Sequence, residues 1–220
     1  MPNYFPPNSN SFVKWLAWGG GTFAILLIVA LPLYARMTNN AVGVPVAQPI
    51  DFPHNIHVAV MGLDCRYCHT SVENSNTASV PPTETCMTCH SQLRVDTPQL
   101  QAVVASWNSG APIQWNRVHG LPDYAFFDHS AHVNNGVGCS SCHGRVDQMA
   151  QMWKNEPLTM GWCLECHRDP SSQLRPVSEV FNMSYTPLSD PIAQANLGQT
   201  LIEAYHIDTD KLIQCSTCHR

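Results

Sequence analysis

The ten cysteines of this 220-residue chain fall into five pairs with a single spacing, and a histidine directly follows each pair. The motifs are Cys65/Cys68/His69, Cys86/Cys89/His90, Cys139/Cys142/His143, Cys163/Cys166/His167 and Cys215/Cys218/His219. Two thiols at this spacing bond to the two vinyl-derived carbons on one edge of a haem, and the imidazole that follows binds the iron. The sequence therefore predicts five covalently bound haem c groups, each with one proximal histidine.

Two other uses of paired cysteines explain less of this pattern. A zinc protein needs no histidine directly after each pair, and ten thiols with five histidines do not divide into four-coordinate sites. Disulfides, or a thioredoxin-like redox pair, would leave the five histidines without a role.

Six histidines remain outside the motifs, and four of them form a repeat. Phe52-x-His54-x-x-His57 precedes the first two motifs, and Phe127-x-His129-x-x-His132 precedes the third and fourth. Imidazoles three residues apart on a helical turn point to nearly the same side but not along one line, so they can reach two different irons. We predict that these four histidines are distal iron ligands, with each phenylalanine packed against a porphyrin.

The fifth iron has several candidate ligands. We favour His119, in Trp115-x-x-x-His119-x-Leu-Pro-Asp-Tyr, over His206, which lies between acidic residues. A methionine would raise the potential relative to a second imidazole, so Met149 or Met160 is the alternative ligand of one haem, although methionine also fills gaps beside porphyrins. Because the candidate distal ligands equal or outnumber the five irons, we expect no iron open to a substrate and no catalytic residue.

The composition excludes an ordinary globular enzyme and a nucleic-acid-binding protein. Charged residues make up 12% of the chain, the net charge is -5, and 17 prolines interrupt regular structure. The region after residue 50 offers about 34 residues per haem, too few to wrap each cofactor separately. The predicted fold class is therefore mostly irregular with short α-helices, packed around five haems in mutual contact that form a path for electrons.

An apolar segment precedes the first motif, with no charge between Lys14 and Arg36. Its length suits a transmembrane helix over residues 15–36, and no clean cleavage site supports the alternative of a signal peptide. Gly19-Gly20-Gly21 and Pro32 suggest a partner helix, although both residue types are common in membrane helices.

The chain thus divides into an N-terminal tail (1–14), an anchor helix (15–36), a linker (37–50) and a pentahaem cytochrome c domain (51–220). Within that domain we expect dihaem repeats at 52–90 and 127–167 and a fifth motif at 215–219.

The Phe-x-His-x-x-His element with its motifs resembles the class III multihaem cytochromes c, in which the first histidine of the pair serves the haem that follows. By this resemblance His54 pairs with His69, and His129 with His143. The whole order, with the stretch from Trp115 to His132 and Met160-Gly-Trp-Cys163, is similar to the pentahaem subunit of bacterial alternative complex III.

This resemblance implies an electron-transfer subunit, not itself an enzyme, of a respiratory or photosynthetic quinol:acceptor oxidoreductase. Implied partners are iron-sulfur, integral membrane quinol-binding and monohaem cytochrome subunits and a periplasmic acceptor, with a single pass through the bacterial inner membrane and the haem domain on the periplasmic side. Two alternatives are a stand-alone anchored quinol dehydrogenase, which typically has four motifs, and a multihaem enzyme such as a nitrite reductase, often marked by Cys-x-x-Cys-Lys.

Overall fold

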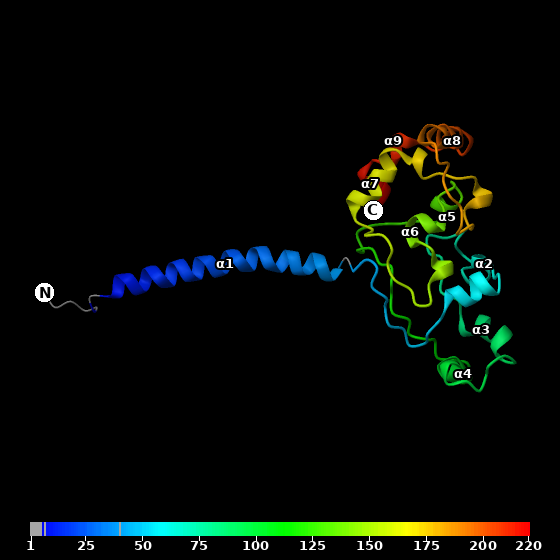
Figure 1. Ribbon diagram of the computed structural model, residues 1–220, viewed down its shortest axis with the longest axis horizontal. Helices are drawn as coiled ribbons and strands as arrows, with labels where there is room; N and C mark the ends of the chain where they lie inside the picture. Colours follow the sequence, from blue (N-terminus) through cyan, green and yellow to red (C-terminus); the bar gives the residue numbers. More distant parts are fainter. Residues whose placement is uncertain (1–5, 7, 40) are drawn as a thin grey trace. The chain divides into compact units, whose positions relative to one another are not determined.

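The computed structural model describes residue 6, residues 8–39 and residues 41–220. The expected tail and linker include residues 1–5, 7 and 40, which lie outside the described residues. The chain divides into two compact units, one that ends at Ala41 and one that begins at Val42 (Figure 1), and each is described by itself.

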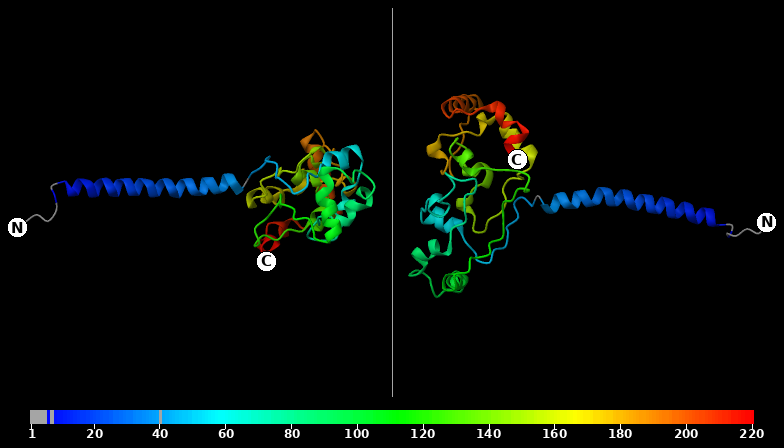
Figure 2. Two further views of the ribbon diagram at one scale, coloured as in Figure 1. Left: turned by 90° about the horizontal axis from the view of Figure 1, so that it is seen from below. Right: turned by 180° about the vertical axis from the view of Figure 1, so that it is seen from behind.

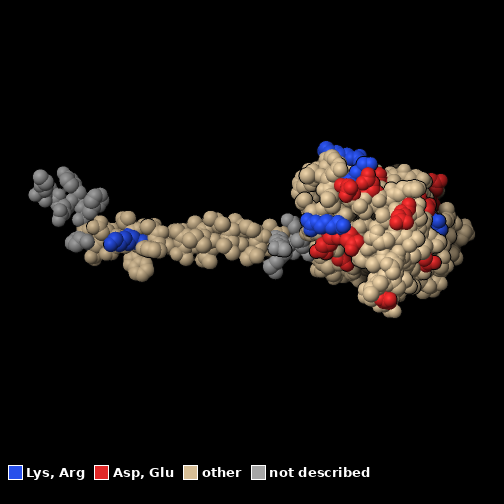
Figure 3. Space-filling view, turned by 90° about the horizontal axis from the view of Figure 1, so that it is seen from above, with Lys and Arg blue, Asp and Glu red and all other residues tan. Residues whose placement is uncertain are grey.

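The first unit is one long helix, α1 (Ser9–Asn39). Its residues Ser9–Ala35 have a mean hydropathy of 2.0, so by length and composition the helix can cross a membrane, a test that a signal sequence also passes. Apolar side chains are exposed along it, and the surface in Figure 3 is uncharged over most of its length. The helix contains the segment that the sequence predicts as an anchor.

The second unit consists of short helices joined by irregular chain (Figure 2), which confirms the helical and irregular character predicted from the sequence. The described residues form isolated β-bridges but no strand. The helical elements are η1 (Asn55–Val60), α2 (Cys65–Cys68), α3 (Thr83–His90), η2 (Pro98–Leu100), α4 (Gln101–Ser109), α5 (His129–Val133), α6 (Cys139–His143), η3 (Val146–Gln148), α7 (Met160–Arg168), η4 (Pro170–Ser172), η5 (Val177–Glu179), α8 (Pro191–Ala204), α9 (Thr209–Leu212) and α10 (Cys215–Cys218).

Polar caps set where several of these helices begin. Asp64 accepts a hydrogen bond from the Arg66 backbone N–H at the start of α2, and Thr159 accepts one from Trp162 at the start of α7. Asp128 caps α5 in the same way. Side-chain acceptors of this kind satisfy N–H groups that have no partner within a first helical turn.

The second half of the expected linker is built into the second unit. Val42 and Pro45 form β-bridges with Lys154 and Trp153, and the Gly43 N–H donates to the Lys154 carbonyl at 2.8 Å. Extended backbone can satisfy its polar groups against a neighbouring segment even where prolines and glycines prevent a helix.

An apolar cluster joins distant parts of the second unit. Val72, Val133 and Val180 are buried together, and Cys139 and Phe181 pack against them. The cluster connects the segment after the first motif with α5 and α6. Figures 1 and 2 show α4 at one end of the unit and α8 with α9 at the other.

Candidate cofactor-binding site

Each cysteine pair lies on one helical turn. The pairs are carried by α2, α3, α6, α7 and α10, all ten cysteines lie in the described residues, and none forms a disulfide. Residues three apart on a helix share a face, so both thiols of a pair can approach one edge of a planar group.

Four of the five motif histidines are oriented by a backbone carbonyl. The His69 Nδ1 atom lies 2.7 Å from the Ser79 backbone oxygen. The Nδ1 atoms of His90, His167 and His219 each lie 3.0 Å from a backbone oxygen, that of Leu93, Leu212 and Tyr124, respectively. A carbonyl only accepts a hydrogen bond, so Nδ1 carries the proton and Nε2 keeps a lone pair. This arrangement is typical of metal-binding histidines.

The two Phe-x-His-x-x-His elements have nearly the same geometry. Phe52 stacks on His57 with ring centroids 4.3 Å apart, and Phe127 stacks on His132 at 4.5 Å. In each element the earlier histidine meets the phenylalanine edge-on at 4.8 Å. Each phenylalanine therefore orients both imidazoles of its element, a contact that the sequence analysis did not anticipate.

Three of these imidazoles face a motif histidine. The ring centroids are 6.2 Å apart for His57 and His90, 6.4 Å for His129 and His143, and 6.1 Å for His132 and His167. Imidazoles bound on opposite sides of one metal ion, with bonds of about 2 Å, have centroids about 6 Å apart. The spacing therefore fits an iron atom between the two rings of each pair.

Burial lowers the pKa of two of the candidate ligand imidazoles. It lowers the pKa of His143 to about 3, with neighbouring His119 and His129 as further causes. Burial, followed by His69 and His57, lowers the pKa of His54 to about 4. Neutral imidazole is the form that binds a metal ion.

The other sequence candidates lie in different surroundings. The His119 Nε2 atom is 3.3 Å from the His143 Nδ1 atom. Met149 is 1% exposed, whereas Met160 is 67% exposed. His206 has a left-handed backbone (φ 55°) in the loop after α8.

Arg175 is a buried cation that the sequence analysis missed. Only 4% of it is exposed, and its guanidinium donates to the hydroxyls of Ser140 and Ser141, the two residues between the cysteines of the third motif. It also lies over the Tyr185 ring, 4.5 Å from the centroid. Its buried Nε has no hydrogen-bond partner. The sequence carries no local signal of this contact, because Ser140 and Ser141 lie 35 and 34 residues from Arg175.

Thiol pairs on helical turns, imidazoles that face each other, and Nδ1 atoms held by carbonyls are together the features of a multihaem c-type cytochrome. Residues 33–110, which contain the first two motifs, match the Class III cytochrome C family. The chain is also 28% identical, over 207 residues, to a protein named the multiheme cytochrome c subunit of menaquinone reductase in Nitratidesulfovibrio vulgaris. That match covers 94% of this chain and 83% of the relative. The first comparison relates the part of the chain with the first two motifs to class III cytochromes c, and the second relates nearly the whole chain to a multihaem cytochrome c.

Proposed function

We propose that this chain is a membrane-anchored pentahaem cytochrome c that relays electrons between quinol and a periplasmic acceptor. The observation that carries the proposal is the set of facing imidazoles, with ring centroids 6.1 to 6.4 Å apart, next to three Cys-x-x-Cys-His turns. Each haem iron, when bound, alternates between the ferric and ferrous states and so carries one electron.

The residues of the chain bind and orient these groups. In the proposal the ten thiols hold five haems, and the five motif histidines are proximal ligands. His54, His57, His129 and His132 are the distal ligands of the first, second, third and fourth motifs, respectively. Carbonyl acceptors fix the tautomer of most of these rings, which raises their basicity as iron ligands.

Two imidazoles on one short element also bring neighbouring irons together. His129 and His132 lie on the single turn α5 and face the histidines of the third and fourth motifs, respectively. Since electron tunnelling falls steeply with distance, such an arrangement suits a relay better than isolated catalytic centres.

We further propose that α1 is an uncleaved anchor and that the cytochrome works inside a quinol:acceptor oxidoreductase of the alternative complex III type. The haem domain would lie on the periplasmic side of the inner membrane, and quinol would bind to accompanying membrane subunits. The length and apolarity of α1 and the order of motifs support this placement.

The relative's name favours a second direction of electron flow. It is called a subunit of a menaquinone reductase, so the same relay in this protein would deliver electrons to a quinone instead of receiving them from a quinol. The chemistry of the relay is identical in both directions.

Purification from membranes in a mild detergent tests the proposal. We expect the cytochrome to copurify with iron-sulfur and integral membrane subunits, and its haems to be reduced by menaquinol in that complex. If the cytochrome is isolated alone and still oxidises quinol, the stand-alone quinol dehydrogenase is the better description. Rapid quinone reduction by the complex supplied with a reduced periplasmic donor, without quinol oxidation, would favour the second direction.

A further inference from the structure

The first and second motifs touch through the residues between their cysteines. The Tyr67 hydroxyl lies 2.9 Å from the Thr88 hydroxyl. Tyr67 belongs to Cys65-x-x-Cys68 and Thr88 to Cys86-x-x-Cys89. The two haem attachment turns are therefore direct neighbours, although sixteen residues of chain separate His69 from Cys86.

The first and third motifs are joined through α5. The Asn76 carbonyl, seven residues after His69, accepts hydrogen bonds from the His129 backbone N–H (3.3 Å) and ring Nδ1 (2.9 Å). His129 in turn faces His143. The loop after the first motif thus orients an imidazole that faces the third motif.

The third and fourth motifs are connected through α5, a single helical turn that lies between them in space. His129 faces the third motif and His132 faces the fourth, and both side chains come from α5. The fourth motif then meets the fifth, because the His167 Nδ1 atom lies 3.0 Å from the carbonyl of Leu212, three residues before Cys215.

We infer that the five haem sites form one unbranched series in the spatial order second, first, third, fourth, fifth motif. The inference rests on the proposed function, and it reverses the first two motifs relative to the sequence. The haems of the second and fifth motifs are then the two ends of the relay, where electrons arrive and leave. Each internal transfer oxidises one ferrous iron and reduces its ferric neighbour.

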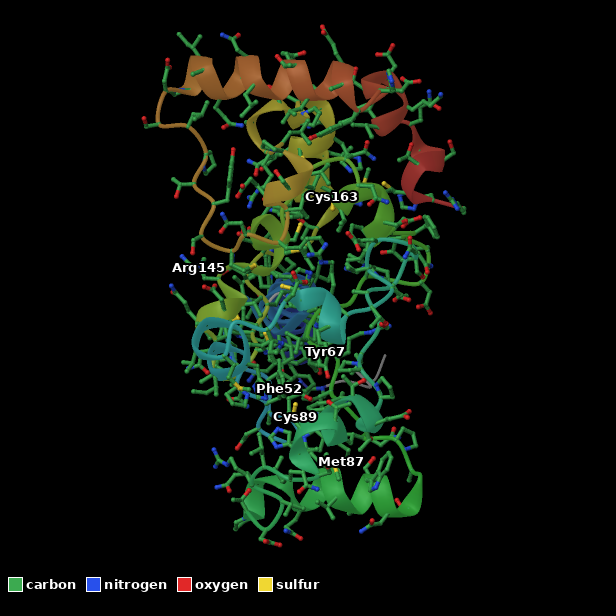
Figure 4. The ribbon with its side chains drawn as sticks, turned by 90° about the vertical axis from the view of Figure 1, so that its right-hand side faces the viewer. Phe52, Tyr67, Met87, Cys89, Arg145 and Cys163 are labelled. Atoms are coloured by element: carbon green, nitrogen blue, oxygen red, sulfur yellow. The ribbon has the colours of Figure 1, made fainter. Side chains whose placement is uncertain are left out.

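The helices place the two ends far apart within the second unit. The second motif lies on α3, which packs on α4, and α4 lies at one end of the unit (Figure 1). The fifth motif follows α9, which packs on α7 at the opposite end. In Figure 4, Cys163, Tyr67 and Cys89 follow one another along the unit. A donor and an acceptor can therefore dock at separate surfaces.

A high-spin marker placed at one iron tests the order, because it speeds the electron-spin relaxation of neighbouring low-spin irons. We would prepare the full chain with its haems as His57→Ala (marker at the second motif) and as His129→Ala (marker at the third). We expect faster relaxation of one low-spin haem in the first variant and of two in the second. Ser130→Ala, which leaves both imidazoles of α5 in place, is the matched control.

The outcomes separate the inference from the proposed function. Faster spin relaxation of two low-spin haems in His57→Ala, or of only one in His129→Ala, would overturn the linear order while leaving a pentahaem cytochrome intact. A chain with fewer than five haems, or one in which neither variant creates a high-spin iron, would contradict the proposed function itself. If one variant fails to fold, Cys86→Ser with Cys89→Ser removes an end haem, and we expect the other four to exchange electrons at the unmodified rate. Slowed exchange among them would place the second motif inside the series.

Discussion

Seven histidines direct Nδ1 at a backbone carbonyl: His57, His69, His90, His129, His132, His167 and His219. This shared contact fixes one tautomer without any charged partner, so each Nε2 keeps its lone pair. At the scale of single residues, the chain specifies ligand orientation through its backbone. The consequence is that removing one imidazole should affect one iron.

We expect His132→Ala to convert one haem to a high-spin form, because the ring facing His167 at 6.1 Å is lost. Paramagnetic resonance should show one altered haem, and the reduced variant should bind carbon monoxide at one site. Replacing His129 as well should alter two haems. Unchanged low-spin signals in His132→Ala would show that this residue is not a ligand.

His143 differs from the other motif histidines, since its Nδ1 meets the His119 Nε2 atom instead of a carbonyl. If Nδ1–H donates to His119, the His119 lone pair is not available to iron, and His119 strengthens His143 as a ligand. We then expect His119→Leu to leave the spin state of every haem unchanged and to raise one midpoint potential by about 59 mV, equivalent to a roughly tenfold loss of ferric-state stabilisation.

The variant His119→Gln retains an acceptor oxygen and should restore the original potential in a redox titration. A high-spin haem in His119→Leu would instead identify His119 as a distal ligand, as the sequence analysis expects.

At the scale of elements, the motif spacing predicted short helices, and the repeat predicted two equivalent histidine elements. The first element is a π-helix, η1, whereas the second is the α-helical turn α5. Sequence alone did not separate these cases, because both place Phe and two histidines in similar contacts. Arg175 could not be anticipated either, since its partners Ser140 and Ser141 lie 34 or more residues away.

The contact between α8 and η4 depends on a glycine. A Cβ atom at Gly198 would overlap the Ser171 backbone, which cannot move as freely as a side chain. We expect Gly198→Ala to lower the unfolding free energy of the haem-loaded protein by about 1–3 kcal/mol, measured by denaturant titration. Gln199→Ala, at an exposed position of the same helix, should change it by less than about 0.5 kcal/mol. Equal effects of the two substitutions would argue against close packing at Gly198.

At the scale of the whole molecule, α1 and the second unit have separate roles in the proposal. Intact-mass spectrometry should find five haems and residues 1–36 on the same chain. Cys215→Ser combined with Cys218→Ser should remove one haem and leave four, because the fifth motif lies at an end of the series and outside both repeats. A mature chain that begins near residue 36 would make α1 a signal sequence.

Spin quantitation of the oxidised wild-type protein against its haem content tests most directly whether the facing imidazoles bind iron. We expect five haems per chain and at least four low-spin ferric irons with two imidazole ligands. Fewer than four such irons, with the remainder high-spin, would contradict the pairing of His54, His57, His129 and His132 with the motif histidines.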